Sequence, residues 1–268
     1  MSPTSPAPAS PTPPPLTPPL LVPPSLTLPP LILPSSTPQS PTSPPPTSTP
    51  RFVVPAYFHP TDHPDSWNTL AELGQNLAFA ILNPDSGPGH AIDARYAEPI
   101  AAIHAAGGEV VGYVDTGYGR RSGSAVLREL AAYQSWYGLR GGFLDQVPTG
   151  PEHVAHYRRL IAAAREMGVD HIALNPGTTP APEYAELADM VITFEGPWVA
   201  YGDHIVAEWT RHHPPERFCH LVHSAPLAEL AAVRDGARGR HAGAVYVTQL
   251  SGANPWGSLS PLFEHVAA

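Results

Sequence analysis

Two acidic residues, Asp145 and Glu195, each follow a short apolar run. Glycosidic bond cleavage needs two carboxyl groups, one that protonates the leaving oxygen and one that attacks or activates water. Apolar neighbours such as Phe194 and Trp198 favour a protonated Glu195, whereas the amide of Gln146 favours an ionised Asp145. In the alternative interpretation both acids only cap helices. The pair therefore points to acid–base chemistry if the fold brings the two residues together.

Eight short apolar runs recur along the chain, and several of them end in polar or acidic residues. Buried parallel strands read as continuous apolar runs because both faces of the sheet are covered. Strands that alternate with helical segments indicate βαβ units. Eight such units predict a single (β/α)₈ barrel, in which the carboxyl ends of all strands meet at one face. The runs span residues 52–57, 78–82, 109–114, 141–144, 171–174, 190–194, 218–222 and 244–247.

Helical segments are predicted between these runs from apolar spacing, proline at first turns and glycine at the ends. An open, doubly wound sheet is the alternative architecture. It would need a glycine-rich fingerprint after the first strand, which residues 57–60 do not supply. The predicted helical segments are 93–106, 124–137, 151–167, 182–188, 198–212, 226–235 and 261–266.

Polar residues after the second and third runs are candidates for substrate binding. Asn83 and Asp85 lie in a tight loop fixed by two glycines and two prolines. Asp115, Tyr118 and Arg120 follow the third run and suit sugar hydroxyls, which need donors, acceptors and a stacking surface. An ordinary βα turn and a solvated Asp115–Arg120 ion pair remain the alternatives.

Five further residues at predicted strand ends complete the candidate substrate-binding set. Trp256 follows the eighth run in a glycine-rich loop, where it could stack on a sugar ring or pack over the barrel end. His59 is expected to form a hydrogen-bonding wall of the cleft. The others are Tyr57, Gln146 and Asn175.

Several segments, in order along nearly the whole predicted barrel, resemble the spherulin-4-like family. The resemblance implies a (β/α)₈ glycoside hydrolase that cleaves, in an endo fashion, an exopolysaccharide of α-1,4-linked galactosamine or N-acetylgalactosamine. It also implies an extracellular or cell-surface location, although no classical signal peptide is visible. The segments are residues 54–58, 83–89, 112–119, 133–137, 142–145 and 194–195.

The resemblance implies catalytic roles for Asp145 and Glu195. In the family an Asp-Glu pair commonly ends the fourth strand, and a Glu ends the sixth. This chain has Gln146 in place of the second member of the pair. Because Gln cannot exchange a proton at neutral pH, any role that needs an acid there is lost. Asp145 and Glu195 still make a complete pair.

The first 50 residues differ in composition from the rest of the chain. They hold 20 of the 37 prolines, and the first charged residue is Arg51. Proline removes backbone donors and fixes φ, so we expect residues 1–50 to be disordered and residues 51–268 to form the barrel. The apolar stretches within residues 1–50 are too short and too interrupted by proline to span a membrane.

Charge and cysteine content exclude several classes of function. The net charge is −9, all 14 basic residues are Arg, and no basic run suggests a nucleic-acid partner. The absence of lysine excludes a lysine Schiff base, a pyridoxal phosphate anchor and a Walker-type phosphate loop. The lone Cys219 lies in an apolar run, where a buried, inert thiol is expected. We expect a monomer whose partner is the polysaccharide.

Histidine is abundant, with 14 residues, and histidine side chains are common metal ligands. His59 and His63 have the spacing of some zinc deacetylases, but Pro60 and Pro64 disfavour the helix that would align them, and no motif supplies a third ligand. We therefore expect neither metal nor other cofactor. A non-catalytic carbohydrate-binding barrel and a metal-dependent polysaccharide deacetylase remain the alternatives to a glycosidase.

Overall fold

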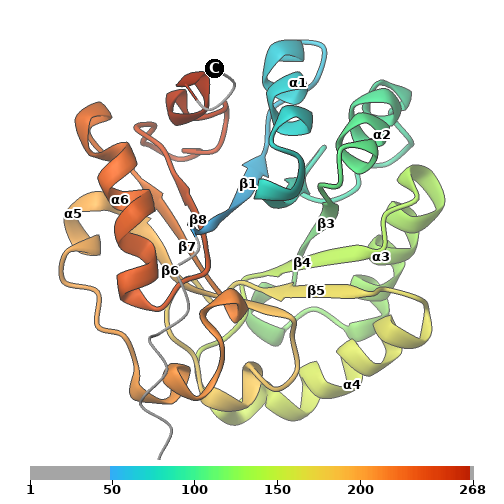
Figure 1. The fold of residues 1–268 in the computed structure, drawn as a ribbon. Coiled ribbons are helices and arrows are strands. Elements are labelled where there is room, and N and C mark those ends of the chain that lie inside the picture. Colours follow the sequence, from blue (N-terminus) through green and yellow to red (C-terminus); the bar gives the residue numbers. More distant parts are fainter. Residues whose placement is uncertain (1–48, 266–268) are drawn as a thin grey trace, which may run out of the picture. The chain divides into compact units, whose positions relative to one another are not determined.

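The computed structural model describes residues 49–265, and this part forms a closed barrel of eight parallel strands in chain order. Helices surround the strands (Figure 1). The predicted fold class is thereby confirmed. The expected disorder of residues 1–50 lies, for residues 1–48, outside the described residues.

Each strand overlaps one of the eight apolar runs. All six residues of β2 are buried, and burial is similarly continuous along the other strands, which is why the runs show no alternation. The strands are β1 Arg51–Ala56, β2 Leu77–Leu82, β3 Val110–Asp115, β4 Gly141–Asp145, β5 His171–Leu174, β6 Met190–Pro197, β7 Phe218–His223 and β8 Ala244–Val247.

Within residues 49–265, six α-helices and several short 3₁₀ turns connect the strands. The predicted helix over 182–188 is only a 3₁₀ turn, Pro182–Tyr184, and the one over 198–212 divides into α5 and a 3₁₀ turn, Glu208–His212. The first helix was missed by the sequence analysis. The helices are α1 Pro64–Glu72, α2 Ala97–Ala105, α3 Gly123–Tyr137, α4 Val154–Glu166, α5 Trp198–Tyr201 and α6 Leu230–Ala237.

The ends of α3 follow directly from its sequence. Ser122 caps the first turn by accepting a hydrogen bond from the Ala125 N–H, and the chain leaves the helix through Gly138 at φ +69°. The buried face of α3 includes Tyr133, whose hydroxyl donates to the carbonyl of Leu82 at the end of β2. This contact ties the helix to the strand end that faces the site.

Two properties of the described residues concern membranes and thiols. No helix between residues 49 and 265 is long and apolar enough to cross a bilayer. Cys219 is a free, fully buried thiol on β7, and burial raises its pKa well above the ordinary value. A thiol that remains protonated is a poor nucleophile, in agreement with the expected inert role.

Candidate active site

Asn175 holds the two predicted catalytic acids together at the carboxyl ends of the strands. Its side-chain Nδ2 donates to Asp145 Oδ1 at 2.8 Å and to Glu195 Oε2 at 2.6 Å. Since both oxygens contact one nitrogen atom, these two oxygens are at most about 5.4 Å apart, which is shorter than the roughly 6.5–9.5 Å between the carboxyl groups of inverting glycosidases. Asn175 follows β5, so it lies between β4, which carries Asp145, and β6, which carries Glu195.

Three groups stabilise the charged form of Asp145. The Tyr113 hydroxyl donates to Oδ2 at 2.7 Å, Asn175 donates to Oδ1, and the backbone N–H of Gln146 also faces the carboxylate. Burial raises the pKa of Asp145, and these three donors oppose the rise by stabilising the charged form.

Glu195 has fewer stabilising partners. Burial raises its pKa, the charge of Asp145 raises it further, and only Asn175 and the indole of Trp256 oppose the rise. Fewer groups therefore stabilise the charged form of Glu195 than of Asp145. The assignment of Glu195 as the acid and Asp145 as the carboxylate stays a prediction.

The backbone beside Asp145 adopts an uncommon conformation. Gln146 has φ +52° and Tyr118 has φ +55°, and the Tyr118 N–H donates to the Gln146 carbonyl at 2.7 Å. Left-handed backbone at non-glycine residues is costly, and it persists where surrounding contacts fix it, often at functional sites. Both residues line the cavity described next.

A cavity of about 410 Å³ opens onto both carboxylates. Its size falls in the range of small-molecule sites. Five predicted site residues line it: the two acids, Asn175, Tyr118 and Gln146. His223 also lines it, although the sequence analysis did not select that residue. The lining residues are Tyr118, Asp145, Gln146, Asn175, Pro176, Gly177, Glu195 and His223.

His223 and Tyr113 are the site residues that sequence reasoning missed. His223 ends β7, its Nδ1 contacts the Ser224 hydroxyl at 2.9 Å, and the Trp256 ring lies edge-on at 5.9 Å. Burial lowers the pKa of His223, which favours the neutral imidazole. Its position directly after the seventh apolar run was the available signal. Tyr113 lies inside the third apolar run, where nothing in the sequence marks it as a site residue.

Three predicted residues lie close to the carboxylates without lining the cavity. The Tyr57 ring packs edge-on against Tyr113 at 5.7 Å, and Asp145 and Glu195 contribute to raising its pKa after burial. Trp256 is buried beside Glu195. Asp115 pairs with Asp145 in the register of β3 and β4.

The loop after β3 differs from the ion pair considered as an alternative. Asp115 Oδ1 accepts the Gly117 N–H at 2.6 Å, and the Arg120 guanidinium lies 5.6 Å from the centre of the Tyr118 ring. It is Arg121 that contacts the Asp115 carbonyl, at 2.5 Å. Arg120 therefore lies beside the half-exposed Tyr118 and is not among the residues that line the cavity.

Asn83 and Asp85 form the turn after β2 and do not line the cavity. Asn83 Oδ1 accepts the Gly87 N–H at 2.8 Å, and the Asp85 N–H donates to the Gly87 carbonyl at 3.2 Å. These bonds close the tight loop. A substrate-binding role for the two residues stays a prediction.

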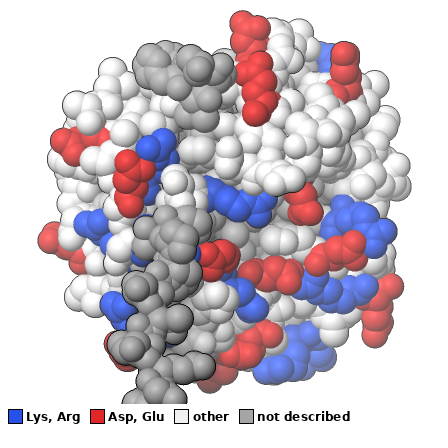
Figure 2. Space-filling view, in the orientation of Figure 1, with Lys and Arg blue, Asp and Glu red and all other residues white. Residues whose placement is uncertain are grey.

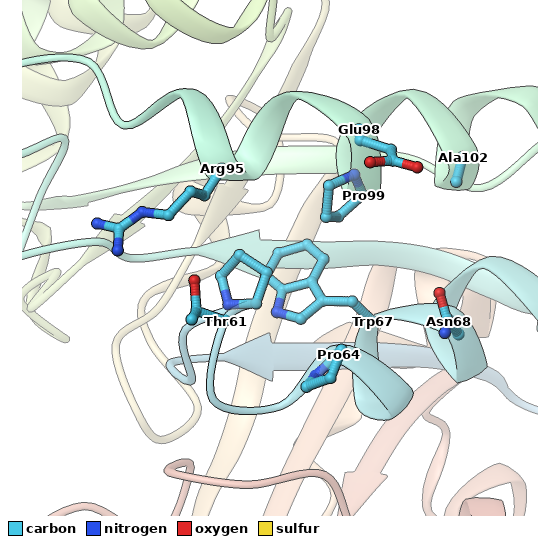
Figure 3. A pocket seen from close by; sticks show the side chains of 9 residues that line it. Thr61, Pro64, Trp67, Asn68, Arg95, Glu98, Pro99 and Ala102 are labelled. Carbon is cyan, nitrogen blue, oxygen red and sulfur yellow. The ribbon is translucent and has the colours of Figure 1, made fainter.

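A second cavity, of about 450 Å³, lies between α1 and α2 (Figure 3). Trp67 faces it but is only 2% exposed, so its ring offers little stacking surface. Near it, His59 Nε2 lies 3.0 Å from Asp93, which also binds Arg95. His59 thus contacts Asp93 and the Tyr96 ring and is not among the residues that line the cavity at the carboxylates, so its role in substrate binding stays a prediction.

The two histidines considered as metal ligands, His59 and His63, contact different partners. His59 pairs with Asp93, whereas the His63 ring packs edge-on against Phe58 at 5.5 Å. Within residues 49–265, no group of three or more His, Cys, Asp or Glu side chains could hold a metal ion.

Figure 2 shows acidic and arginine side chains interspersed over one face of the described part.

Comparison with known proteins identifies the family of this chain. The model of the Spherulation-specific family 4 matches residues 51–268, which is the whole barrel. The chain belongs to this family. A curated relative, Spherulin-4 of Physarum polycephalum, is 34% identical over 146 residues, which are 53% of this chain and 44% of that protein. The match therefore spans less than half the length of this relative.

Two solved structures are similar to this chain. Aspergillus clavatus Sph3, solved in complex with GalNAc, matches with a TM-score of 0.70 and 22% identity over 82% of this chain and 96% of that chain. The glycoside hydrolase domain of PelA from Pseudomonas aeruginosa matches with a TM-score of 0.45 and 16% identity, over 81% and 97% of the two chains. The Sph3 match shows that the fold seen here also occurs in a solved structure.

Proposed function

We propose that this protein is a retaining glycoside hydrolase that cleaves a polysaccharide containing galactosamine or N-acetylgalactosamine. The observation that carries the proposal is the contact of one Asn175 nitrogen with both Asp145 and Glu195 inside a cavity. Two carboxyl groups this close match the retaining geometry of glycosidases. The complex of Sph3 with GalNAc supports the choice of sugar.

The proposed reaction has two steps. In the first, Glu195 donates its proton to the glycosidic oxygen while Asp145 bonds to the anomeric carbon, and the bond to the leaving chain breaks with its electrons on that oxygen. In the second, water gives a proton to Glu195 and attacks the anomeric carbon, which releases Asp145. The configuration at the anomeric carbon is retained. Gln146 takes no part in proton transfer, because its amide does not titrate.

Other lining residues supply contacts for the sugar. The neutral His223 imidazole, held on one side by Ser224 and on the other by Trp256, presents its Nε2 as a donor or acceptor for a hydroxyl. The half-exposed Tyr118 ring, with Arg120 beside it, offers a surface on which a sugar ring can stack at the entrance.

Amide substitutions of the two acids test the assignment. Asp145→Asn and Glu195→Gln should each lower kcat by about 10² to 10⁴, because each group acts mainly in the transition state, while polymer binding persists. The assay measures reducing ends and product sizes from partially deacetylated galactosamine polymer. Asp170→Asn is the matched control, since this exposed acid pairs with Arg140, on the strand-start side of the barrel. A variant that keeps more than about a tenth of the turnover excludes its residue from the mechanism.

The same assay separates the alternatives. A carbohydrate-binding barrel would retain polymer without releasing reducing ends. A metal-dependent deacetylase would release acetate and lose activity on dialysis against a strong chelator, with recovery on addition of zinc. We expect chelation to leave hydrolysis unchanged. NMR of the first product should show the anomer of the substrate, whereas the opposite anomer would contradict the retaining mechanism.

A further inference from the structure

Thr116, directly after β3, is a buried polar residue that the proposed reaction does not use. It is 1% exposed, and its Oγ1 lies 2.7 Å from the Asp145 carbonyl and 2.9 Å from the Gln146 carbonyl. Its backbone N–H also donates to the Asp145 carbonyl, at 3.0 Å. Thr116 therefore binds the backbone on both sides of the link between Asp145 and Gln146.

Tyr157 of α4 completes this arrangement from outside the barrel. Its side chain is fully buried, and its hydroxyl lies 2.5 Å from Thr116 Oγ1. Carbonyl oxygens only accept hydrogen bonds, so the single Thr116 hydroxyl proton points to them. It follows that the Tyr157 hydroxyl donates to Thr116. The chain of donors runs from α4 through Thr116 to the end of β4.

The backbone that receives these bonds is held in a costly conformation. Gln146 has φ +52°, and in this conformation its N–H faces the Asp145 carboxylate. Left-handed backbone at a residue with a side chain is strained and relaxes unless neighbours fix it. The bonds from Thr116, together with the Tyr118 N–H, are the contacts that fix it here.

We propose that Thr116 and Tyr157 are positioning residues, which hold the Asp145–Gln146 peptide in the conformation that turns its N–H toward the Asp145 carboxylate. The inference rests on the proposed catalytic role of Asp145, since neither residue touches the sugar. Without this support the peptide would relax and the carboxylate would lose one of its three donors. The charged form of Asp145, which the first step needs, would then be less stable.

The other groups that act on Asp145 remain in place when this support is removed. These groups lie on other strands: Tyr57 directly follows β1, Tyr113 and Asp115 belong to β3, and Glu195 belongs to β6. Tyr113 favours the ionised Asp145 by its hydrogen bond, whereas Asp115 disfavours it by like charge. A change confined to the peptide N–H should therefore raise the pKa of Asp145 and leave Glu195 nearly unaffected.

Thr116→Val and Tyr157→Phe remove one hydroxyl each while they conserve side-chain volume. The carboxyl carbon of Asp145, labelled with ¹³C and assigned by its absence in Asp145→Asn, is titrated by NMR. We expect a pKa about half a unit or more above that of the unsubstituted protein. Where hydrolysis is measured, kcat should fall about 10-fold at unchanged KM. The acidic limb of the pH–rate profile should move to higher pH.

Two matched controls remove equivalent hydroxyls elsewhere. Thr210 is also buried and donates to the Ala207 carbonyl at 2.7 Å, and Tyr184 is fully buried and donates to the Gly150 carbonyl at 3.2 Å. Thr210→Val and Tyr184→Phe should leave the Asp145 titration unchanged. Thr116→Ser, which keeps the hydroxyl, should restore it.

The titration does not depend on turnover, so the two proposals fail separately. If the unsubstituted protein hydrolyses no polymer, the proposed function is wrong while the titration still tests the positioning role. If folded Tyr157→Phe and Thr116→Val titrate like the unsubstituted protein, the positioning role is wrong. An equal shift in the two controls would also overturn it.

Discussion

A single side-chain amide sets the geometry of the carboxylate pair. Asn175 is 5% exposed, and its Oδ1 accepts the Gly177 N–H at 2.9 Å. That bond fixes which way the amide points, so both Nδ2 hydrogens face the carboxylates. A residue predicted to contact substrate is thus placed to orient the reacting groups. The arrangement stabilises the charged form of both acids in a site where burial opposes it.

Removal of this amide should change the pH dependence of hydrolysis. In Asn175→Ala both Asp145 and Glu195 lose a donor that lowers their pKa, so each pKa rises. Since one acid must be ionised and the other protonated, both limbs of the kcat/KM profile should move to higher pH. We expect a loss of kcat of about 10-fold or more, because the separation of the acids is no longer fixed.

The control for this change is Asn68→Ala, an exposed asparagine on α1. Its profile should coincide with that of the unsubstituted protein. A shift of the acidic limb alone in Asn175→Ala would show that the amide acts on Asp145 and not on Glu195. An unchanged profile would contradict the bridging role altogether.

At the scale of elements, close packing of α3 on the sheet depends on glycines in the strands. A Cβ at Gly112 of β3 would lie 2.3 Å from the Tyr133 ring, and one at Gly142 of β4 would lie 2.7 Å from Leu130. Such distances are far below van der Waals contact. The glycines therefore let α3 approach the two strands whose ends carry Tyr113 and Asp145.

Gly112→Ala should destabilise the barrel strongly. The buried Tyr133 ring cannot move aside without loss of its bond to Leu82 and of its packing, and overpacking of this kind costs about 1–3 kcal/mol or more. For a domain of this size, that lowers the Tm by several degrees, about 2–4 °C per kcal/mol. Gly239→Ala, where no atom lies within 4 Å, is the control and should change the Tm little. Equal Tm values for both variants would refute the packing argument.

The elements also explain which features the sequence allowed us to predict. All eight strands were found because burial on both faces makes each a continuous apolar run. Helix α1 was missed because Pro60 and Pro64 were taken to disfavour a helix, although proline is well tolerated in a first turn, where Pro64 begins α1. The site followed from strand ends: Asp145, Glu195, Asn175 and Gln146 meet because the barrel closes. Tyr113 could not be found, since an inward-facing tyrosine within a run looks like core.

On the scale of the whole molecule, the site exists only when the barrel is closed. Its groups come from β3, β4, β6 and β7 and from the loops after β5 and β8, which are spread over most of the described chain. Whatever unfolds the barrel therefore removes the site. A buried histidine next to β6 makes this dependence sensitive to acid.

His220 of β7 lies behind the strand that carries Glu195. Its ring nitrogens contact the Tyr201 hydroxyl at 2.9 Å and Thr193 Oγ1 at 3.1 Å, and the ring is 1% exposed. Burial lowers the pKa of His220 to about 3, with smaller contributions from His204 and Arg240. In the unfolded chain the same group titrates near its ordinary value of 6.5.

The sign of the pH dependence follows from this difference. Between pH 6.5 and 3 the unfolded chain binds a proton at His220 that the folded protein does not, so acid favours unfolding. Each pH unit below about 6.5 should cost about 1.4 kcal/mol from this group, until the cost levels off near pH 3. His220→Gln, which keeps polar atoms but cannot titrate, should be less stable than the unsubstituted protein at pH 7 and should lose less stability on acidification. Thermal unfolding at pH 7, 6, 5 and 4 measures the difference, with the exposed His212→Gln as control. If the Tm of His220→Gln falls as steeply with acid as that of the unsubstituted protein, His220 is not the source of the acid sensitivity.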